Sequence, residues 1–294
     1  MYRLFYYIIY GFLWMLSLLP FRILYIISDA LYIVAYYVLG YRKTVVVSNL
    51  KNAFPEKSNQ EIRFIAKQFY KHLCNVIFET IALLTMSEQT MKRRVTYRNI
   101  EIFDDLYKKD KHVCVITGHY GNWEWICSSP LWLQHKSVTL YQPLKNKHFD
   151  KLMSKLRTKF GAEIIPKREG VKRILQLHKQ ETLTASLFIG DQTPMKHEIQ
   201  YWTTFLNQDT PVYLGIEKIA RKSNQAVVFL SPKKIKRGYY EIEIIKISEN
   251  GKETKPYEIT EAHVNLLEKT IRSKPEYWLW SHRRWKHVRS YSHI

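Results

Sequence analysis

The stretch VCVITGHYGNWEWICSSP, residues 113–130, joins an apolar run to a glycine-bounded turn that contains a histidine, and then to a glutamate between two tryptophans. The run VCVIT is short, apolar and rich in β-branched residues, which is typical of a buried strand. Gly118 and Gly121 allow a tight turn after it, and a helix is expected to begin near Asn122. Strand, turn and helix in this order predict one unit of an α/β fold.

Similar β-rich runs alternate with helical patterns from about residue 95 onward. They are SVTLY at 137–141, LTASLFI at 183–189, QAVVFLS at 225–231 and EIEIIKI at 241–247. The helices expected between them include VKRILQLHK from Val171 and a segment from Thr210, where threonine suits the N-cap and Pro211 suits the first helical position. The alternation predicts an α/β sheet with helices on its faces.

Two apolar stretches precede this pattern. The first, residues 4–21, is uncharged and would reach about 27 Å as one helix, close to the ~30 Å hydrocarbon core of a bilayer. The second, residues 23–41, contains Asp29, and tyrosines are frequent in both stretches, as in an interfacial belt. We expect a membrane-seated helical hairpin or a single anchor, with two helices of a soluble core as the alternative. No A-x-A-like cleavage site follows the first stretch, so a removed signal peptide is not expected.

A long amphipathic helix is predicted after a polar break at residues 52–60. Ser58 and Glu61 have the spacing of a capping box, and apolar residues then recur at helical period up to Leu84. No Gly/Ser-rich linker, repeat or low-complexity segment divides the sequence. The expected organisation is an anchor at 1–40 and one domain at 41–294, made of a helical lead-in at 41–94 and an α/β core at 95–294.

Charge narrows the class of partner. The chain has 46 lysines and arginines against 26 acidic residues, a formal charge of +20, so anionic partners are expected: nucleic acid, a phospholipid surface, phosphorylated lipid or an acidic protein. The basic residues are spread along the chain and form no known nucleic-acid-binding motif, so we expect no nucleic-acid partner. Cys74, Cys114 and Cys127 form no CxxC pair, which argues against a disulfide framework or a zinc site.

His119 is the candidate catalytic base. Glu124 lies five residues after it, but about one His–acid pair at this spacing is expected by chance, and His263 with Glu268 forms another. The second pair falls in a predicted helix, where five residues turn the side chains about 140° apart, so we place it on a solvated helix face.

The chain around His119 can instead fold back between a strand and a helix, and so bring Glu124 to the imidazole. A neutral histidine would then remove a proton from an attacking hydroxyl, while the carboxylate holds the ring tautomer. A turn histidine with a glutamate that serves only the helix dipole is the alternative.

TGHYGNWEW resembles the HX4D/E motif of the glycerolipid-type acyltransferases, and GHYGNWE is especially similar to the late acyltransferases of lipid A biosynthesis, of the lauroyl/myristoyl type. Further similar blocks follow in order between about residues 40 and 287: YQPLKNKHFDKLMSKLRTKFG, IIPKREGVKRIL, FIGDQTP, FLNQDTPVYLGIEKIARKSNQAVVF and PEYWLWSHRRWK. The resemblance implies a glycerolipid acyltransferase-like fold with a mixed central sheet. It also implies transfer of a fatty acyl group from acyl carrier protein to a hydroxyl of a lipid A precursor.

The resemblance also implies roles for particular residues. His119 is the expected general base and Glu124 its orienting carboxylate. The expected substrate-binding residues are Asn122, Arg157, Arg168, Asp191 and Gln192. The two arginines suit a phosphate or a charged carbonyl oxygen, with ordinary surface arginines as the alternative, and capping or turn roles remain open for the other three. No metal or cofactor is expected because the thioester of the co-substrate supplies the activation, and Cys127 is expected to be a packing residue.

Location and partners are implied in the same way. The expected place is the cytoplasmic face of the bacterial inner membrane, where anionic membrane lipid attracts a basic protein and acyl carrier protein is acidic. Two other functions stay open: an acyltransferase for lysophospholipid or an aminolipid, and a non-catalytic basic membrane-binding protein. The C-terminal PEYWLWSHRRWK is expected to line a pocket or an interface, or to form a packed core edge.

Overall fold

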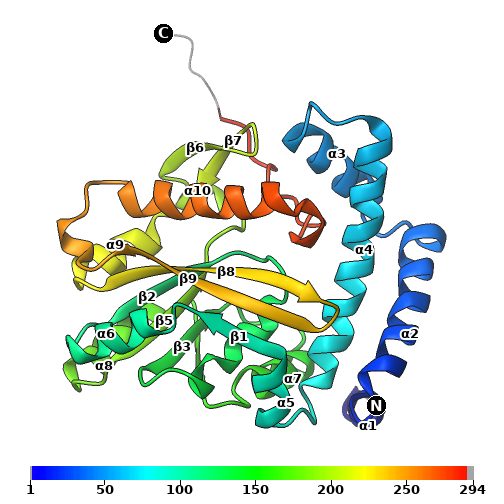
Figure 1. Cartoon of the computed structure of the whole chain (residues 1–294), viewed down its shortest axis with the longest axis horizontal. Helices are drawn as coiled ribbons and strands as arrows, with labels where there is room; N and C mark the ends of the chain where they lie inside the picture. Colours follow the sequence, from blue (N-terminus) through cyan, green and yellow to red (C-terminus); the bar gives the residue numbers. More distant parts are fainter. Residues whose placement is uncertain (1, 290–294) are drawn as a thin grey trace.

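The computed structural model of the chain describes residues 2–289 (Figure 1). Its strands are β1 (Val95–Arg98), β2 (Val113–Thr117), β3 (Lys136–Tyr141), β4 (Glu163–Pro166), β5 (Thr184–Ile189), β6 (Tyr201–Phe205), β7 (Gln208–Val212), β8 (Ala226–Lys236) and β9 (Tyr239–Ser248). A seven-stranded sheet has the order β1-β9-β8-β2-β5-β3-β4, and β6 pairs with β7 in a separate hairpin. Neighbouring strands of the large sheet are parallel except for the β8–β9 pair, so the predicted mixed sheet is confirmed.

Helices surround this sheet. The α-helices are α1 (Tyr2–Ser17), α2 (Phe21–Ile33), α3 (Lys43–Ala53), α4 (Asn59–Ala82), α5 (Glu88–Arg94), α6 (Glu101–Lys108), α7 (Lys147–Arg157), α8 (Gly170–Lys179), α9 (Gly215–Lys222) and α10 (Glu258–Ser273). Shorter elements are the π-helical turn η1 (Val34–Val38) and the 3₁₀ helices η2 (Trp123–Leu131), η3 (Lys196–Glu198), η4 (Gly251–Glu253) and η5 (Pro275–Tyr277).

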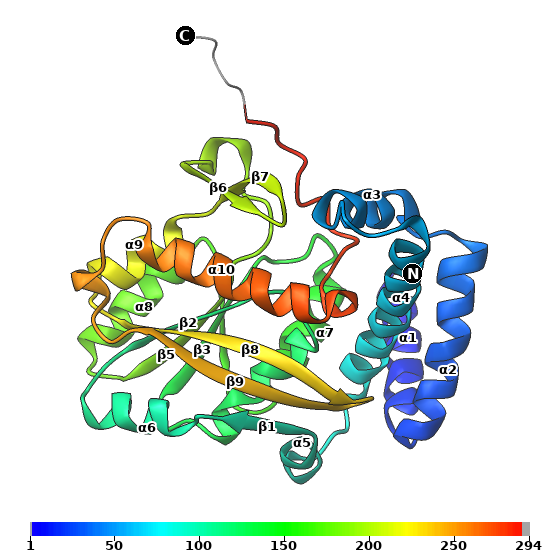
Figure 2. The same ribbon diagram turned by 45° about the horizontal axis from the view of Figure 1, so that its top comes forward.

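Strand β2 is buried on both faces, as its apolar sequence predicts. Cys114 and Ile116 point into a core shared with α3, α4, α9 and α10, whereas Val113 and Val115 point into a second core shared with α5, α6, α7 and η2. Successive side chains of a strand point to opposite faces, so an all-apolar strand requires a helical layer on each side. Figure 2 shows α9 and α10 on one side of the sheet and α6 on the other, and α7 packs into the second core through Leu152 and Leu156.

The N-terminal helices lie together at one end of the sheet. Helices α1 and α2 pack along α4, and the turn between β8 and β9 points toward α4 (Figure 1). Helix α4 has the predicted start, because the Ser58 side chain accepts a hydrogen bond from the Glu61 backbone while the Glu61 carboxylate accepts one from the Ser58 backbone.

The two apolar stretches differ from the prediction in length. Helix α1 ends at Ser17, because Pro20 disfavours helical geometry at the residue before it, so the first stretch is not a single span-length helix. The segment Phe21–Val38 is instead long and apolar enough to cross a membrane, and 22% of it is buried. Length and composition alone are weak evidence for a membrane anchor, since a core helix or a signal sequence can meet the same criteria.

The helix predicted from Thr210 is wrong. Thr210 and Pro211 lie in β7, where Thr210 pairs with Thr203, and the following helix α9 begins at Gly215. The threonine–proline pair suits a helix start, but Pro211 belongs to a two-stranded hairpin, where a missing N–H is tolerated on an edge strand.

Candidate active site

Two parallel neighbouring strands end in matching sequences at the candidate site. Strands β2 and β5 pair in register, with Thr117 opposite Ile189. Each strand is followed by a glycine and then by an ionisable residue, His119 after β2 and Asp191 after β5. The carboxyl ends of parallel strands lie at the same edge of a sheet, which is where open α/β sheets place their ligands. His119 and Asp191 are therefore brought together although 72 positions separate them.

The Asp191 carboxylate holds the histidine at two points. Its Oδ1 lies 2.6 Å from Nδ1 of His119, and its Oδ2 accepts a hydrogen bond of 2.8 Å from the His119 backbone N–H. The Oδ2 also accepts a 2.7 Å hydrogen bond from the indole N–H of Trp278. Only 3% of the Asp191 side chain is exposed, against 15% for His119, so the carboxylate lies behind the ring.

This arrangement determines the charge of the acid and the tautomer of the base. Burial raises the pKa of Asp191, but the adjacent His119 ring and the hydrogen bonds from His119 and Trp278 outweigh it and lower the pKa to about 2. The carboxylate is therefore ionised and can only accept hydrogen bonds. In the neutral ring, Nδ1 must then carry the proton, which leaves the lone pair on Nε2.

The Nε2 atom faces the open side of the site. The exposed Gln192 amide nitrogen lies 3.2 Å from it, and the Trp123 ring meets the imidazole edge-on with centroids 5.4 Å apart. A substrate hydroxyl can replace the amide at Nε2. The ring atom with the lone pair is thus the one on the open side of the site, where it is able to accept a proton.

Two glycines make the turn possible. A Cβ at Gly118 would lie 2.7 Å from Leu267 and 3.2 Å from the Asp191 carboxylate, so a side chain there would press on the contact that orients His119. Gly121 has a φ of +60°, in the left-handed region that glycine adopts at little cost. Its backbone N–H donates to the Tyr277 carbonyl, which ties the turn to the C-terminal segment.

The predicted partner of His119 is corrected. Both oxygens of Glu124 accept hydrogen bonds from Arg157, at 2.9 Å from Nε and 2.8 Å from Nη2, while Asp191 holds the imidazole. Glu124 lies in the first turn of the 3₁₀ helix η2, which is capped by Asn122, whose side chain accepts a hydrogen bond from the Trp125 backbone N–H. The orienting position that we assigned to Glu124 is thus occupied by Asp191, and Glu124 forms a two-point ion pair with Arg157.

The other predicted substrate-binding residues lie in different settings. The buried Asn122 amide donates to Glu79 at 2.7 Å, so its polar atoms support the turn, which favours the capping alternative. Arg168 is exposed after β4, and Arg157 faces Glu124. Asp191 and Gln192 both reach the His119 ring. The structure therefore gathers Asp191, Gln192 and His119, and it assigns Asn122 to the scaffold.

The second His–acid pair does not meet, as predicted, but its histidine is not on a solvated face. His263 on α10 is 3% exposed and its Nδ1 lies 3.1 Å from the Ile259 carbonyl, whereas Glu268 accepts hydrogen bonds from the Leu206 backbone and Arg272. Burial lowers the pKa of His263 and favours its neutral form.

The C-terminal segment supports the site from behind. Trp278 and Trp280 are buried and pack edge to face with centroids 4.7 Å apart, so the packed-edge alternative describes them, and Trp278 also donates to Asp191. The His282 ring accepts a hydrogen bond from the Thr193 backbone N–H, next to Gln192. Burial lowers the pKa of His282 to about 4, so the ring is neutral at pH 7 and able to accept.

Sequence reasoning missed the true partner of His119 and the contact from Trp278. The signal for the first was present: VCVIT-Gly-His and SLFI-Gly-Asp are two buried strands with the same ending. No group of three or more His, Cys, Asp or Glu side chains within the described part of the chain is arranged to hold a metal ion. Cys74, Cys114 and Cys127 are buried and unpaired, and Cys127 Sγ contacts the Glu124 carbonyl at 2.7 Å.

Comparison with known proteins matches nearly the whole chain to the family that its motifs resemble. The family model described as bacterial lipid A biosynthesis acyltransferase matches residues 1–287. The lipid A biosynthesis lauroyltransferase of Escherichia coli K12 is 22% identical over 277 residues, which cover 94% of this chain and 89% of the relative. The lipid A biosynthesis acyltransferase of Haemophilus influenzae is 21% identical over 276 residues, or 92% and 83% of the two chains.

Proposed function

The chain belongs to the bacterial lipid A biosynthesis acyltransferase family and is an acyltransferase, and from this premise we propose that it transfers a fatty acyl chain from acyl carrier protein to a hydroxyl of a lipid A precursor. This is a secondary acylation of lipid A, and family membership supports it. The Asp191–His119 pair, at the carboxyl ends of two parallel strands, is the observation that supports the chemistry.

The first step is proton removal by His119. Its Nε2 accepts the proton of the acceptor hydroxyl as that oxygen attacks the thioester carbonyl. The ionised Asp191 beside Nδ1 stabilises the imidazolium that forms and keeps the ring oriented. This type of base catalysis contributes roughly 10²–10⁴-fold to a rate.

The second step is collapse of the tetrahedral intermediate. The carbon–sulfur bond breaks, the thiolate of the carrier leaves, and the imidazolium returns the proton to that sulfur. The Gln192 amide, once replaced at Nε2 by the acceptor, stays beside the reacting carbonyl and donates a hydrogen bond to its oxygen. The histidine ends the cycle neutral, and the reaction requires no nucleophile from the protein.

Glu124 and Arg157 have a supporting role in this proposal. The guanidinium is held by two parallel hydrogen bonds, which leaves Nη1 without a bond to Glu124. That remaining edge can bind an oxygen of the acceptor phosphate or of the reacting carbonyl. The exposed Arg168 is proposed to bind acceptor phosphate at the rim.

Membrane association is proposed through the N-terminal helices. Large apolar side chains of α1, α2 and η1 are exposed, among them Phe12 at 55%, Ile26 at 68% and Val38 at 73%. Exposed apolar area of this extent is unfavourable in water and favourable in a bilayer. We propose the cytoplasmic face of the inner membrane, where the acyl carrier protein donor is available.

The test uses the purified full chain in detergent with acyl carrier protein thioester. It is supplied in parallel with a lipid A precursor, lysophosphatidic acid and an aminolipid, and the products are measured by mass spectrometry. Transfer to the lipid A precursor that is lost in His119→Ala supports the proposal. Strong transfer to lysophosphatidic acid with none to the precursor refutes the acceptor, and unchanged transfer by His119→Ala refutes the catalytic site.

A further inference from the structure

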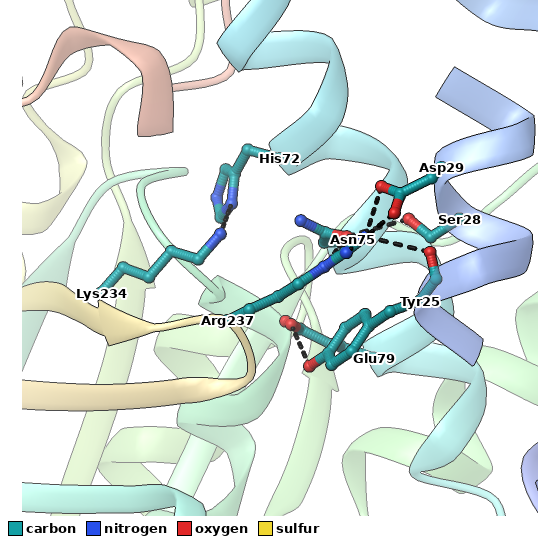
Figure 3. A network of polar contacts seen from close by, with 8 residues as sticks. All are labelled: Tyr25, Ser28, Asp29, His72, Asn75, Glu79, Lys234 and Arg237. Carbon is teal, nitrogen blue, oxygen red and sulfur yellow. Dashed lines mark hydrogen bonds and ion pairs between the residues drawn. The ribbon is translucent and has the colours of Figure 1, made fainter. Parts of the chain in front are cut away.

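A cavity of about 530 Å³ lies between α2, α4 and the carboxyl end of β8, where the chain turns into β9. Its charged lining consists of Lys71, Lys234, Lys236, Arg237 and Asp29. Four cations against one carboxylate make it electropositive, and Figure 3 shows part of its wall, with Arg237 directed toward Asp29 and Lys234 toward His72.

Arg237 holds the wall together and is largely neutralised. It donates to both oxygens of Asp29, at 3.0 and 2.6 Å, and to the Asn75 side chain and the Tyr25 carbonyl. These contacts join the β8–β9 turn to α2 and α4. The uncompensated charge of the cavity therefore lies on its lysines.

Lys234 is held in place by neighbouring side chains and keeps ammonium N–H groups that can donate to a ligand. Its ammonium lies 3.3 Å from Nδ1 of His72 and 5.1 Å from the centre of the Tyr277 ring. The His72 Nε2 lies 2.9 Å from the Gly121 carbonyl, which can only accept, so Nε2 carries the proton and Nδ1 accepts from Lys234. One of three ammonium N–H groups is used in this contact, which leaves two for a ligand.

Other charges near Lys234 do not occupy those donors. The buried Glu79 and the carboxylate of Glu276 act on Lys234 through space and favour its charged form, while Arg237 opposes it. The Glu79 oxygens accept hydrogen bonds from Tyr25, Asn122 and Tyr240. Burial still lowers the pKa of Lys234, and an anion in the cavity would offset that cost.

The cavity lies beside the apolar surface of the N-terminal helices. Ile33 lines it and is 55% exposed, and the next exposed residues along the chain are Val34, Tyr37 and Val38. A ligand with a charged head in the cavity can therefore extend its alkyl chains along α2 and η1. This combination is typical of lipid recognition, in which lysines bind the headgroup and an apolar helix contacts the chains.

We propose that this cavity binds the phosphate group of a membrane lipid through Lys71, Lys234 and Lys236. The phosphate belongs either to the lipid acceptor or to a surrounding phospholipid, and the chemistry of the contact is the same. The proposal concerns binding and stands whether or not acyl transfer occurs.

The cavity is also tied to the turn of the candidate active site. Gly121 donates its backbone N–H to the Tyr277 carbonyl, and its own carbonyl accepts from His72. Both partners line the cavity. A bound headgroup thus rests on the residues that hold the His119 turn, and this consequence alone rests on the proposed function.

The test titrates the detergent-solubilised full chain with dihexanoyl phosphatidic acid in the absence of acyl donor. Calorimetry measures the heat of binding and gives the affinity. Dihexanoyl phosphatidylcholine, whose phosphate carries a choline, and inorganic phosphate are the comparison ligands. We expect Lys71→Gln with Lys234→Gln to weaken phosphatidic acid binding about tenfold or more, because charge-assisted hydrogen bonds are lost. Lys233→Gln, an exposed lysine of the same strand outside the cavity lining, is the matched control and should bind as the unmodified chain.

Each outcome of this experiment supports or overturns the proposal. Equal binding of phosphatidic acid by the double variant and the unmodified chain overturns the proposal, as does equal affinity for inorganic phosphate. Phosphatidylcholine also carries a phosphate, so binding of this lipid that the double variant loses supports the proposal, whereas binding that the double variant keeps overturns it. Lys71→Gln alone, at an exposed helix position, provides the same comparison if the double variant fails to fold. Displacement of phosphatidic acid by a lipid A precursor identifies the acceptor as the source, whereas retained phosphatidic acid identifies a phospholipid. Loss of acyl carrier protein binding with unchanged phosphatidic acid binding would overturn the proposal in favour of a protein partner.

Discussion

Asp191→Asn tests the corrected pair most directly. Oδ2 of Asp191 accepts from two N–H groups, the His119 backbone and the Trp278 indole, whereas Oδ1 meets only Nδ1 of the ring. An asparagine amide nitrogen at the Oδ2 position would face two donors, so it must take the Oδ1 position instead. There it donates to Nδ1, and the ring is left with its proton on Nε2.

The variant therefore retains its packing and loses the base. With Nε2 protonated, the histidine cannot accept the proton of the acceptor, and no carboxylate stabilises the imidazolium. We expect kcat to fall by about 10²–10⁴-fold with little change in KM, the range for removing a general base or reversing its tautomer. Acyl transfer from the carrier thioester measures the rate, and nitrogen NMR of the labelled imidazole measures the tautomer.

Glu124→Gln is the matched control, because it alters the other carboxylate of the site without touching the ring. It weakens the contact with Arg157 and should reduce the rate less than Asp191→Asn does. If Asp191→Asn retains more than about a tenth of the rate while Glu124→Gln abolishes it, the assignment of Asp191 as the orienting carboxylate is wrong.

Three further predictions concern the scaffold. Gly118→Ala should destabilise the protein by about 1–2 kcal/mol, since its Cβ would lie 2.7 Å from the buried Leu267, and should lower acyl transfer; an unchanged rate would contradict the close approach. Glu79→Leu leaves three hydrogen-bond donors unpaired and should cost about 3 kcal/mol or more in urea unfolding, whereas Glu79→Gln should cost less. Burial lowers the pKa of His282 in the folded chain to about 4, below its ordinary 6.5, so the unfolded chain binds this proton first and stability should fall as the pH drops from 6.5 to 4. His282→Gln should therefore reduce the dependence of the melting temperature on pH. An unchanged dependence would contradict the low pKa of His282.

Local patterns in the sequence were enough for the elements that depend on neighbours along the chain. The capping spacing of Ser58 and Glu61 forms as predicted, because both groups lie within one helical turn. The strand at 113–117 has the predicted bounds, since an apolar β-branched run has few places other than a sheet interior. The hairpin around Thr210 was missed because a threonine–proline pair has the same local preference at a helix start as at an edge strand.

The candidate site required contacts that no local pattern contains. The family resemblance placed the chemistry at His119, but both residue spacing and the shared motif pointed to Glu124, which lies nearby in sequence. The register of β2 with β5 brings Asp191 to the ring instead, and Arg157 from α7 engages Glu124. Burial then decides protonation, since the low pKa of Asp191 depends on donors from His119 and Trp278 that only meet in the folded chain.

The sequence alone determined the class of fold, the basic charge, the apolar N-terminus and the family, because composition, periodicity and ordered motifs are properties of the chain itself. The tertiary structure decided which carboxylate holds His119, that His263 is buried, and where the lysines of α4 and β8 surround a cavity. These depend on strand register and helix packing, in which residues far apart along the chain compete for the same partner. Separation along the sequence does not tell which of two carboxylates contacts His119, whereas their distance in the folded chain does.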